Sequence, residues 1–323
     1  MKILIYSFND KIGDGLQKIS FLQEIKRIYP NSYITYTTTN TTTLKDKLKP
    51  LIKDCIDEFL ENNEITSSFK NFFKKNKLFE DKYFDLIIDL QKVVLRTISL
   101  KKIPHGMFFS ASANFLFSDI KNTKKYKFKN IYIEKFYFNI ISIISGKRIN
   151  NIPDIVVPKS DIKFQIIKTE TAKNIGIAPG AGSIDRIWNF KNYLNIAKYL
   201  KEKGYNIYFF LGPDEKHLIK MCLENNFICP EWKNGKLITN NISFTMNLAK
   251  QMNFLLCNDG GTSWMFEFSG VKTLKIFDIT SENKFARPGF CQAIQVRDYG
   301  YTIKNFPVSQ YKKILDRYLS KIN

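Results

Sequence analysis

Hydrophobic and polar residues alternate along this chain in blocks that predict strands followed by helices. Residues 2–8 form an apolar run of strand length, and residues 16–28 carry Leu and Ile at the spacing of a helix with one buried face. Further apolar runs of strand length recur along the chain, at residues 32–38, 83–90, 174–178, 206–211, 254–257 and 273–277.

Glycine-containing turns follow several of these runs and precede helical patterns, as at Gly13-Asp14-Gly15 and at residues 180–182. Strand, glycine turn and helix together are the opening of an α/β unit. The pattern stops at the polar run 146–151 and restarts after Pro153 and Pro158. We therefore predict two Rossmann-like domains facing a central cleft, residues 1–152 and 153–323, with an amphipathic packing helix at the C-terminus.

Composition supports this division and limits the functional classes. A chain of 323 residues with 44% hydrophobic residues can fill two cores. A net charge of +20 favours anionic partners, but no nucleic-acid-binding motif is present, so we expect none of that class. The lysines at 74–77 and 121–129 are interpreted as solvated surface.

Five scattered cysteines without CxxC spacing and two histidines indicate neither a disulfide framework nor a metal site. No apolar run reaches the length of about 18–20 residues that a membrane span needs, and the N-terminus lacks a signal-peptide pattern. We expect a cytoplasmic protein with no metal or other cofactor. Any contact with the inner face of a bacterial inner membrane would be peripheral.

The segment 251–264 is the most informative part of the sequence. An apolar strand ends in Asn258-Asp259-Gly260-Gly261, and a helical pattern follows. Two glycines allow a ligand to approach the backbone, and the first amides of a helix favour a phosphate. The chain has neither GxGxxG nor GxxxxGK[ST] spacing, which argues against hydride transfer and P-loop ATP hydrolysis.

Several motifs in order and spacing resemble glycosyltransferase family nine, whose best-known members are the ADP-heptose:lipopolysaccharide heptosyltransferases. The resemblance spans both halves of the chain. It is carried by Ile12-Gly13-Asp14, residues 84–91, Pro179-Gly180-Ala181 with Arg186-Ile187-Trp188, residues 211–215, Asn258-Asp259-Gly260-Gly261, and Gly270-Val271.

The resemblance implies a GT-B fold and inverting, metal-independent transfer from a nucleotide-sugar donor to a lipid-linked glycan acceptor. An inverting transferase needs a base for the acceptor hydroxyl, and Asp14 matches the catalytic aspartate of the family. The alternative role of Asp14 is a helix N-cap. Gly13, Gly15 and His105 are the candidates for acceptor contacts.

Donor contacts are expected in the second half. Arg186 lies near the position where family members carry Lys or Arg for the phosphates, and Glu215 resembles a ligand of the ribose hydroxyls. Each has an alternative role, Arg186 as a surface arginine and Glu215 as a first-turn residue favourable to the helix dipole. The remaining donor-side candidates are Ala181, Gly182, Ser183, Asp259, Gly260, Gly261, Thr262, Ser263 and Trp264.

The chain departs from the family where Asp-[Ser/Thr]-Gly-x-x-His is usual, because Gly260 and Trp264 replace the hydroxyl and the imidazole. An indole donates one hydrogen bond but cannot become cationic. The main hypothesis is transfer of a sugar, either a heptose or a hexose. The alternative is a degenerate GT-B domain that binds nucleotide or glycan without transfer.

Overall fold

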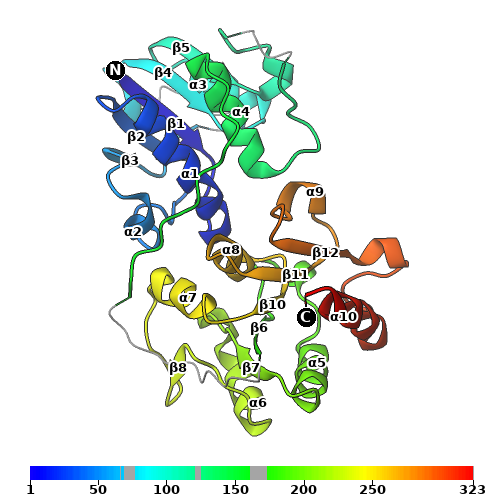
Figure 1. The fold of residues 1–323 in the computed structure, drawn as a ribbon. Coiled ribbons are helices and arrows are strands. Elements are labelled where there is room, and N and C mark those ends of the chain that lie inside the picture. The colour runs from blue at the N-terminus through cyan, green and yellow to red at the C-terminus, as the bar shows by residue number, and fades with distance from the viewer. Residues whose placement is uncertain (66, 69–76, 121–124, 161–172, 323) are drawn as a thin grey trace. The chain divides into compact units, whose positions relative to one another are not determined.

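In a computed structural model, which describes residues 1–323 except 66, 69–76, 121–124, 161–172 and 323, the chain forms two compact units (Figure 1). The N-terminal unit is Met1–Ile155 and the C-terminal unit is Val156–Asn323. Among the described residues, each unit has a sheet of five parallel strands. The predicted lysine surfaces lie outside the described residues at 74–76 and 121–124.

The sheet of the N-terminal unit has the strand order β3-β2-β1-β4-β5. The chain builds one side outward from β1 and then returns to place β4 on its other side, so the winding reverses between β1 and β4. The elements are β1 (Lys2–Ser7), α1 (Ile12–Ile28), β2 (Tyr33–Thr38), α2 (Lys49–Ile52), β3 (Glu58–Leu60), η2 (Lys77–Phe79), β4 (Phe84–Asp89), α3 (Val94–Lys101), β5 (His105–Ser110), η3 (Ser112–Phe115) and α4 (Ile133–Ser145).

The apolar strands of this unit are covered by helices. Ile3, Leu4 and Ile5 of β1 are fully buried, as a central strand of a parallel sheet requires. Helix α1 turns Leu16 and Ile19 inward and packs beside α4 (Figure 1).

The sheet of the C-terminal unit has the order β12-β11-β10-β6-β7, so its winding reverses between β6 and β10. Its elements before the middle strand are β6 (Asn174–Ala178), η4 (Ile184–Arg186), α5 (Phe190–Glu202), β7 (Asn206–Phe209), η5 (Pro213–Leu218), α6 (Ile219–Glu224), β8 (Trp232–Lys233), β9 (Lys236–Leu237) and α7 (Ile242–Ala249). They are followed by β10 (Phe254–Asn258), α8 (Gly261–Phe268), β11 (Lys272–Phe277), α9 (Glu282–Phe285), β12 (Cys291–Gln295), η6 (Val296–Tyr299) and α10 (Val308–Ile322).

Aromatic side chains dominate the core of the C-terminal unit. The indole of Trp188 stacks on Tyr311 of α10 with ring centroids 4.9 Å apart, and its N–H donates to the Phe306 carbonyl at 2.8 Å. Leu315 and Leu319 of α10 are buried against the same core. The last helix therefore closes one face of this unit.

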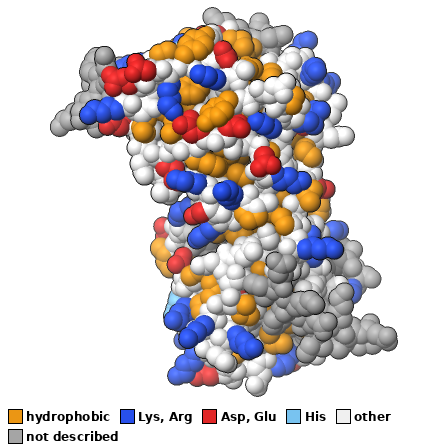
Figure 2. Space-filling model, turned by 90° about the vertical axis from the view of Figure 1, so that its left-hand side faces the viewer, with side chains coloured by type: hydrophobic (Ala, Val, Ile, Leu, Met, Phe, Trp, Pro, Cys, Tyr) orange, Lys and Arg blue, Asp and Glu red, His pale blue; other side chains and the backbone are white. Residues whose placement is uncertain are grey.

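The positive charge is spread out on the face shown in Figure 2, where Lys and Arg side chains alternate with acidic and hydrophobic ones. None of the described helices is long and apolar enough to span a membrane.

Candidate functional site

The donor-side candidates gather at the carboxyl edge of the C-terminal sheet. The loop after β6 carries Ala181, Gly182 and Ser183, and the loop after β10 carries Asp259 and Gly260. These strands are neighbours, and the winding reverses between them. Open α/β sheets bind ligands in the crevice at such a reversal, where the chain leaves the two strands toward opposite faces of the sheet.

Asn258, the last residue of β10, fixes these loops to each other. Its side-chain oxygen accepts from the Trp188 amide at 3.2 Å and the Tyr193 hydroxyl at 2.9 Å, and its amide donates to the Pro179 carbonyl at 2.5 Å. The residue is 1% exposed. Asn258 is not among the predicted site residues, because its partners are 65 or more positions away in the chain.

Gly260 lies where the loops after β6 and β10 approach each other closely. A Cβ at this position would lie 3.0 Å from the Gly180 carbonyl oxygen and 3.2 Å from the Ala181 Cα. Both contacts are with backbone, which cannot rotate away. The structure thus gives a packing reason for glycine where the family usually has a hydroxyl residue.

Helix α8 presents its first amides at this edge. Gly260 is the N-cap residue and supplies no side chain to them, and the Ser263 hydroxyl donates to the Gly260 carbonyl at 2.7 Å. Gly261 and Thr262 occupy the first turn. A helix start of this kind favours an anion through its N–H groups and its dipole.

Arg186 extends from η4 toward the same edge. Its guanidinium lies 3.7 Å from the Asp259 carboxylate, with the Arg186 side chain 39% exposed and that of Asp259 5% exposed. The Arg186 Nε is buried without a hydrogen-bond partner. A half-exposed guanidinium with a vacant N–H, oriented by a carboxylate, is suited to bind two oxygens of a phosphate.

Glu215, in η5, folds back over the loop after β6. A Cβ on Gly180 would lie 2.2 Å from a Glu215 carboxylate oxygen, so the carboxylate occupies the space that the glycine leaves. Burial and the neighbouring Asp214 raise the pKa of Glu215. The structure therefore brings Glu215 to the donor-side loops.

Trp264, which was predicted to contact the donor, is buried. Its side chain is 3% exposed, stacks on Phe268 with centroids 5.8 Å apart, and lies 4.5 Å from the Lys275 ammonium. Lys275 in turn forms a fully buried ion pair with Glu267 at 2.8 Å. The indole thus belongs to the support beneath α8, because it faces the β11 side rather than the solvent.

In the N-terminal unit, Asp14 lies where the winding reverses. It is exposed in the first turn of α1, which follows β1. The prediction that residues 13–15 form a turn before the helix is wrong, because α1 begins at Ile12. Gly15 is buried, and a Cβ there would lie 2.5 Å from the Leu48 side chain. Glycine at position 15 therefore allows close packing of the helix, whereas Gly13 is half-buried in the same turn.

A buried ion pair that was not predicted from the sequence lies beside the first turn of α1, which carries Asp14. Asp10 and Lys18 form an ion pair, and Lys18 also donates to the Asp14 carbonyl at 3.2 Å. Tyr36 and Thr42 donate to Asp10 at 2.7 and 2.9 Å. Burial alone would raise the pKa of Asp10, but Lys18 and the hydroxyl donors outweigh it and lower the pKa.

His105 is not brought to Asp14. It is the first residue of β5, so it lies at the amino edge of the sheet, whereas Asp14 follows the carboxyl end of β1. Its Nδ1 is 2.6 Å from the Ile103 carbonyl, and its Nε2 is 3.9 Å from Asp119. The expected acceptor contact by His105 is not supported by this position.

A family model for glycosyltransferase family 9 (heptosyltransferase) matches residues 74–316. The chain belongs to glycosyltransferase family 9. The matched range begins in the N-terminal unit and contains every donor-side candidate. No curated protein sequence matches the chain.

Solved structures of family 9 enzymes share the fold of this chain. A family 9 glycosyltransferase from Veillonella parvula DSM 2008 has a TM-score of 0.66 at 17% identity, covering 99% of this chain and 97% of that one. The E. coli heptosyltransferase WaaC with ADP-2-deoxy-2-fluoro heptose has a TM-score of 0.61 at 11% identity, covering 98% and 100%. E. coli ADP-heptose lps heptosyltransferase II has a TM-score of 0.58 at 15% identity, covering 99% of both. The chain thus has the GT-B-like fold of these family 9 glycosyltransferases.

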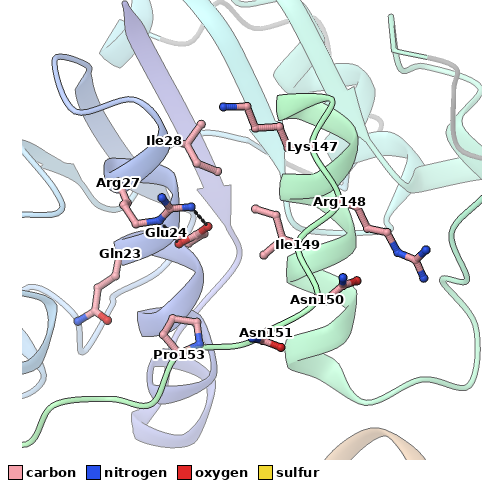
Figure 3. A pocket seen from close by; sticks show the side chains of 10 residues that line it. All are labelled: Gln23, Glu24, Arg27, Ile28, Lys147, Arg148, Ile149, Asn150, Asn151 and Pro153. Atoms are coloured by element: carbon pink, nitrogen blue, oxygen red, sulfur yellow. Dashed lines mark hydrogen bonds and ion pairs between the residues drawn. The ribbon is translucent and has the colours of Figure 1, made fainter.

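One cavity of the N-terminal unit lies away from Asp14, the residue predicted to carry the family's chemistry in this unit. It has a volume of about 780 Å³ and lies between the later turns of α1 and residues 147–153, as Figure 3 shows. Arg27 and Glu24 lie side by side on one face of α1 and form an ion pair of 2.6 Å. Glu24 is ten residues beyond Asp14, about 15 Å along the helix, so the cavity and Asp14 lie at different ends of α1.

Across the described ranges, no group of three His, Cys, Asp or Glu side chains could hold a metal ion.

Proposed function

We propose that this family 9 protein is an inverting glycosyltransferase that moves a sugar, either a heptose or a hexose, from a nucleoside diphosphate to a lipopolysaccharide-type or other cell-surface glycan. Asp14 is the general base in this proposal, and no metal is needed. The observation that carries it is the donor-side edge, where Arg186, Glu215 and the first amides of α8 meet at the reversal of the sheet.

The proposed reaction assigns a task to each group. The Asp14 carboxylate takes the proton of the acceptor hydroxyl while that oxygen attacks the anomeric carbon. The bond from this carbon to the diphosphate oxygen breaks, and the diphosphate leaves with the electron pair. Arg186 and the α8 amides stabilise the charge that develops on it. Attack opposite the leaving group inverts the anomeric centre.

Partners and location follow as further parts of the proposal. The donor is a nucleotide sugar, for which ADP is the first probe because a structural neighbour was solved with ADP. The acceptor is a lipid-linked glycan reached from the cytoplasm at the inner face of the inner membrane. Peripheral contact with anionic lipid fits the net charge of +20.

Calorimetric titration with ADP, GDP and UDP tests the donor site. Arg186→Met is expected to lower nucleotide affinity at least tenfold, because a charge-assisted hydrogen bond to phosphate is lost. Arg317→Met is the matched control, since Arg317 is exposed on α10 and outside the site. Equal affinities for both variants would remove Arg186 from the donor site.

Release of nucleoside diphosphate in the presence of a truncated lipopolysaccharide core tests the base. Asp14→Ala should abolish release while nucleotide affinity stays unchanged, and Asp54→Ala, another exposed aspartate of the same unit, should be active. Chelation with EDTA should not change the rate. Full turnover by Asp14→Ala would assign the base elsewhere.

The alternative is a GT-B domain that binds nucleotide without transfer. Buried Trp264 at the position of the family imidazole favours it, because one donor to the phosphates is then missing. Nucleotide binding by the wild-type protein without release of product, across a panel of sugar donors, would support this alternative.

A further inference from the structure

Three apolar side chains stand exposed on the N-terminal unit near the carboxyl ends of two adjacent strands. Val93 and Val94 lie at the start of α3, after β4, and are 38% and 40% exposed. Leu116 follows η3, after β5, and is 71% exposed. Because β4 and β5 are parallel, these positions share an edge of the sheet, and it is the edge at which α1 begins, with Asp14 in its first turn.

The backbone before Leu116 is strained, and its conformation directs the Leu116 side chain outward. Ala113, Asn114 and Phe115 have φ values of 45°, 55° and 66°, in the left-handed region. This conformation costs about 1–2 kcal/mol for a residue with a Cβ, although Asn tolerates it better. The result is that Phe115 packs on Phe109 at 6.0 Å while Leu116 points outward.

The segment 125–129 joins the same surface. The Phe128 ring lies 4.8 Å from that of Phe115, and the Lys92 ammonium donates to the Phe128 carbonyl at 2.9 Å. Lys92 thereby links the start of α3 to this segment. We call the surface made by residues 92–94, Leu116 and 125–129 the α3–η3 surface.

Charge on the α3–η3 surface is positive. Lys92, Lys125, Lys127 and Lys129 are exposed. Of the acidic residues within 92–120 and 125–134, Glu134 is 1% exposed, and Asp119, whose side chain is 41% exposed, is paired with Lys101 at 2.8 Å. Apolar tips surrounded by lysines fit the interface of an anionic bilayer, where lysines meet headgroups and apolar side chains enter the acyl boundary.

We propose that the α3–η3 surface docks on anionic lipid, with Leu116 inserted below the headgroups. Each lysine near the headgroups contributes about fivefold in affinity. Docking at this edge brings the Asp14 end of α1 to the side of the unit that faces the bilayer, where a lipid-linked acceptor would arrive. Both the arrival of the acceptor there and the lipid contact rest on the proposed function, which includes peripheral contact with anionic lipid, and the new element is the surface that makes this contact.

Vesicle co-sedimentation tests the proposal with the full chain. The wild-type protein should bind phosphatidylcholine vesicles that contain phosphatidylglycerol, bind pure phosphatidylcholine far less, and be released by salt. Leu116→Asp should weaken binding about tenfold, because an apolar contact is replaced by a charge that the lipid repels. Leu223→Asp is the matched control, since Leu223 is 57% exposed on α6 of the C-terminal unit.

Tryptophan fluorescence reports separately on the insertion of residue 116 into the bilayer. Leu116→Trp should show a blue-shifted emission component, quenched by brominated acyl chains, and Leu223→Trp should not. The proposal is overturned if the wild type binds no vesicles, as a surface for a protein partner would behave, or if Leu116→Asp and Leu223→Asp bind equally. Unchanged ADP affinity of Leu116→Asp separates this result from a failure of the donor site.

Discussion

The buried pair of Asp10 and Lys18 leads to the sharpest stability prediction. The side chains are 0% and 4% exposed, and besides Lys18 the carboxylate accepts from Ser7, Tyr36 and Thr42. Lys18→Met keeps the length of the aliphatic chain but leaves a buried charge without its counter-ion. Breaking such a pair typically costs about 3–5 kcal/mol. Since the hydroxyl donors remain, we expect about 3 kcal/mol.

Urea unfolding gives the measurement, because this loss corresponds to a midpoint shift of about 1.5 M for a slope of about 2 kcal/mol per M. All three tryptophans, Trp188, Trp232 and Trp264, lie in the C-terminal unit. Circular dichroism follows both units, whereas tryptophan fluorescence follows the C-terminal one. Lys18→Met should lower the urea midpoint followed by circular dichroism and leave the midpoint followed by tryptophan fluorescence unchanged.

The stability that Asp10 contributes depends on pH with a defined sign. The folded pKa of Asp10 is lowered from 3.8, so its contribution is present above pH 4 and is lost as the pH falls through the folded value. Without Lys18 the carboxylate is protonated more easily, and the penalty of Lys18→Met should shrink on acidification. Lys26→Met, on the same helix, breaks the more exposed pair with Asp57 and should cost at most about 1 kcal/mol. A loss below 1 kcal/mol for Lys18→Met would refute the reasoning.

Further predictions concern the C-terminal unit. Gly260→Ala should destabilise it by about 1–3 kcal/mol and weaken ADP binding, because the new Cβ would meet backbone of Gly180 and Ala181, and thermal melts with and without ADP check both effects. Burial raises the pKa of Glu231 from 4.5 to about 7, so the charged form opposes folding at high pH, and Glu231→Gln should stabilise the protein at pH 8 by on the order of 1–3 kcal/mol but not at pH 5. Equal urea midpoints of Glu231→Gln and wild type at pH 8 would contradict this. Asn258→Ala should weaken ADP binding in titration calorimetry, because the loops after β6 and β10 lose their shared hydrogen bonds.

The strands that sequence patterns found share one property. Strands β1, β6 and β10 are continuous apolar runs, and each is visible without knowledge of its neighbours. Strand β5 escaped prediction because His105 and Gly106 interrupt its pattern, and β12 because Ile294 alone of its five residues is buried at the edge of the sheet. The glycine-rich exits of β6 and β10 were likewise visible locally.

The sequence by itself determined the strand, turn and helix blocks, the family resemblance and the residue types at the donor edge, because these depend on neighbours in the chain. Only the tertiary structure decided which of them meet. It joined Asn258 to Pro179, placed Gly260 against Gly180, buried Trp264 and separated His105 from Asp14. Those outcomes follow from strand order and loop approach, which bring together residues far apart in the chain and which no local pattern records.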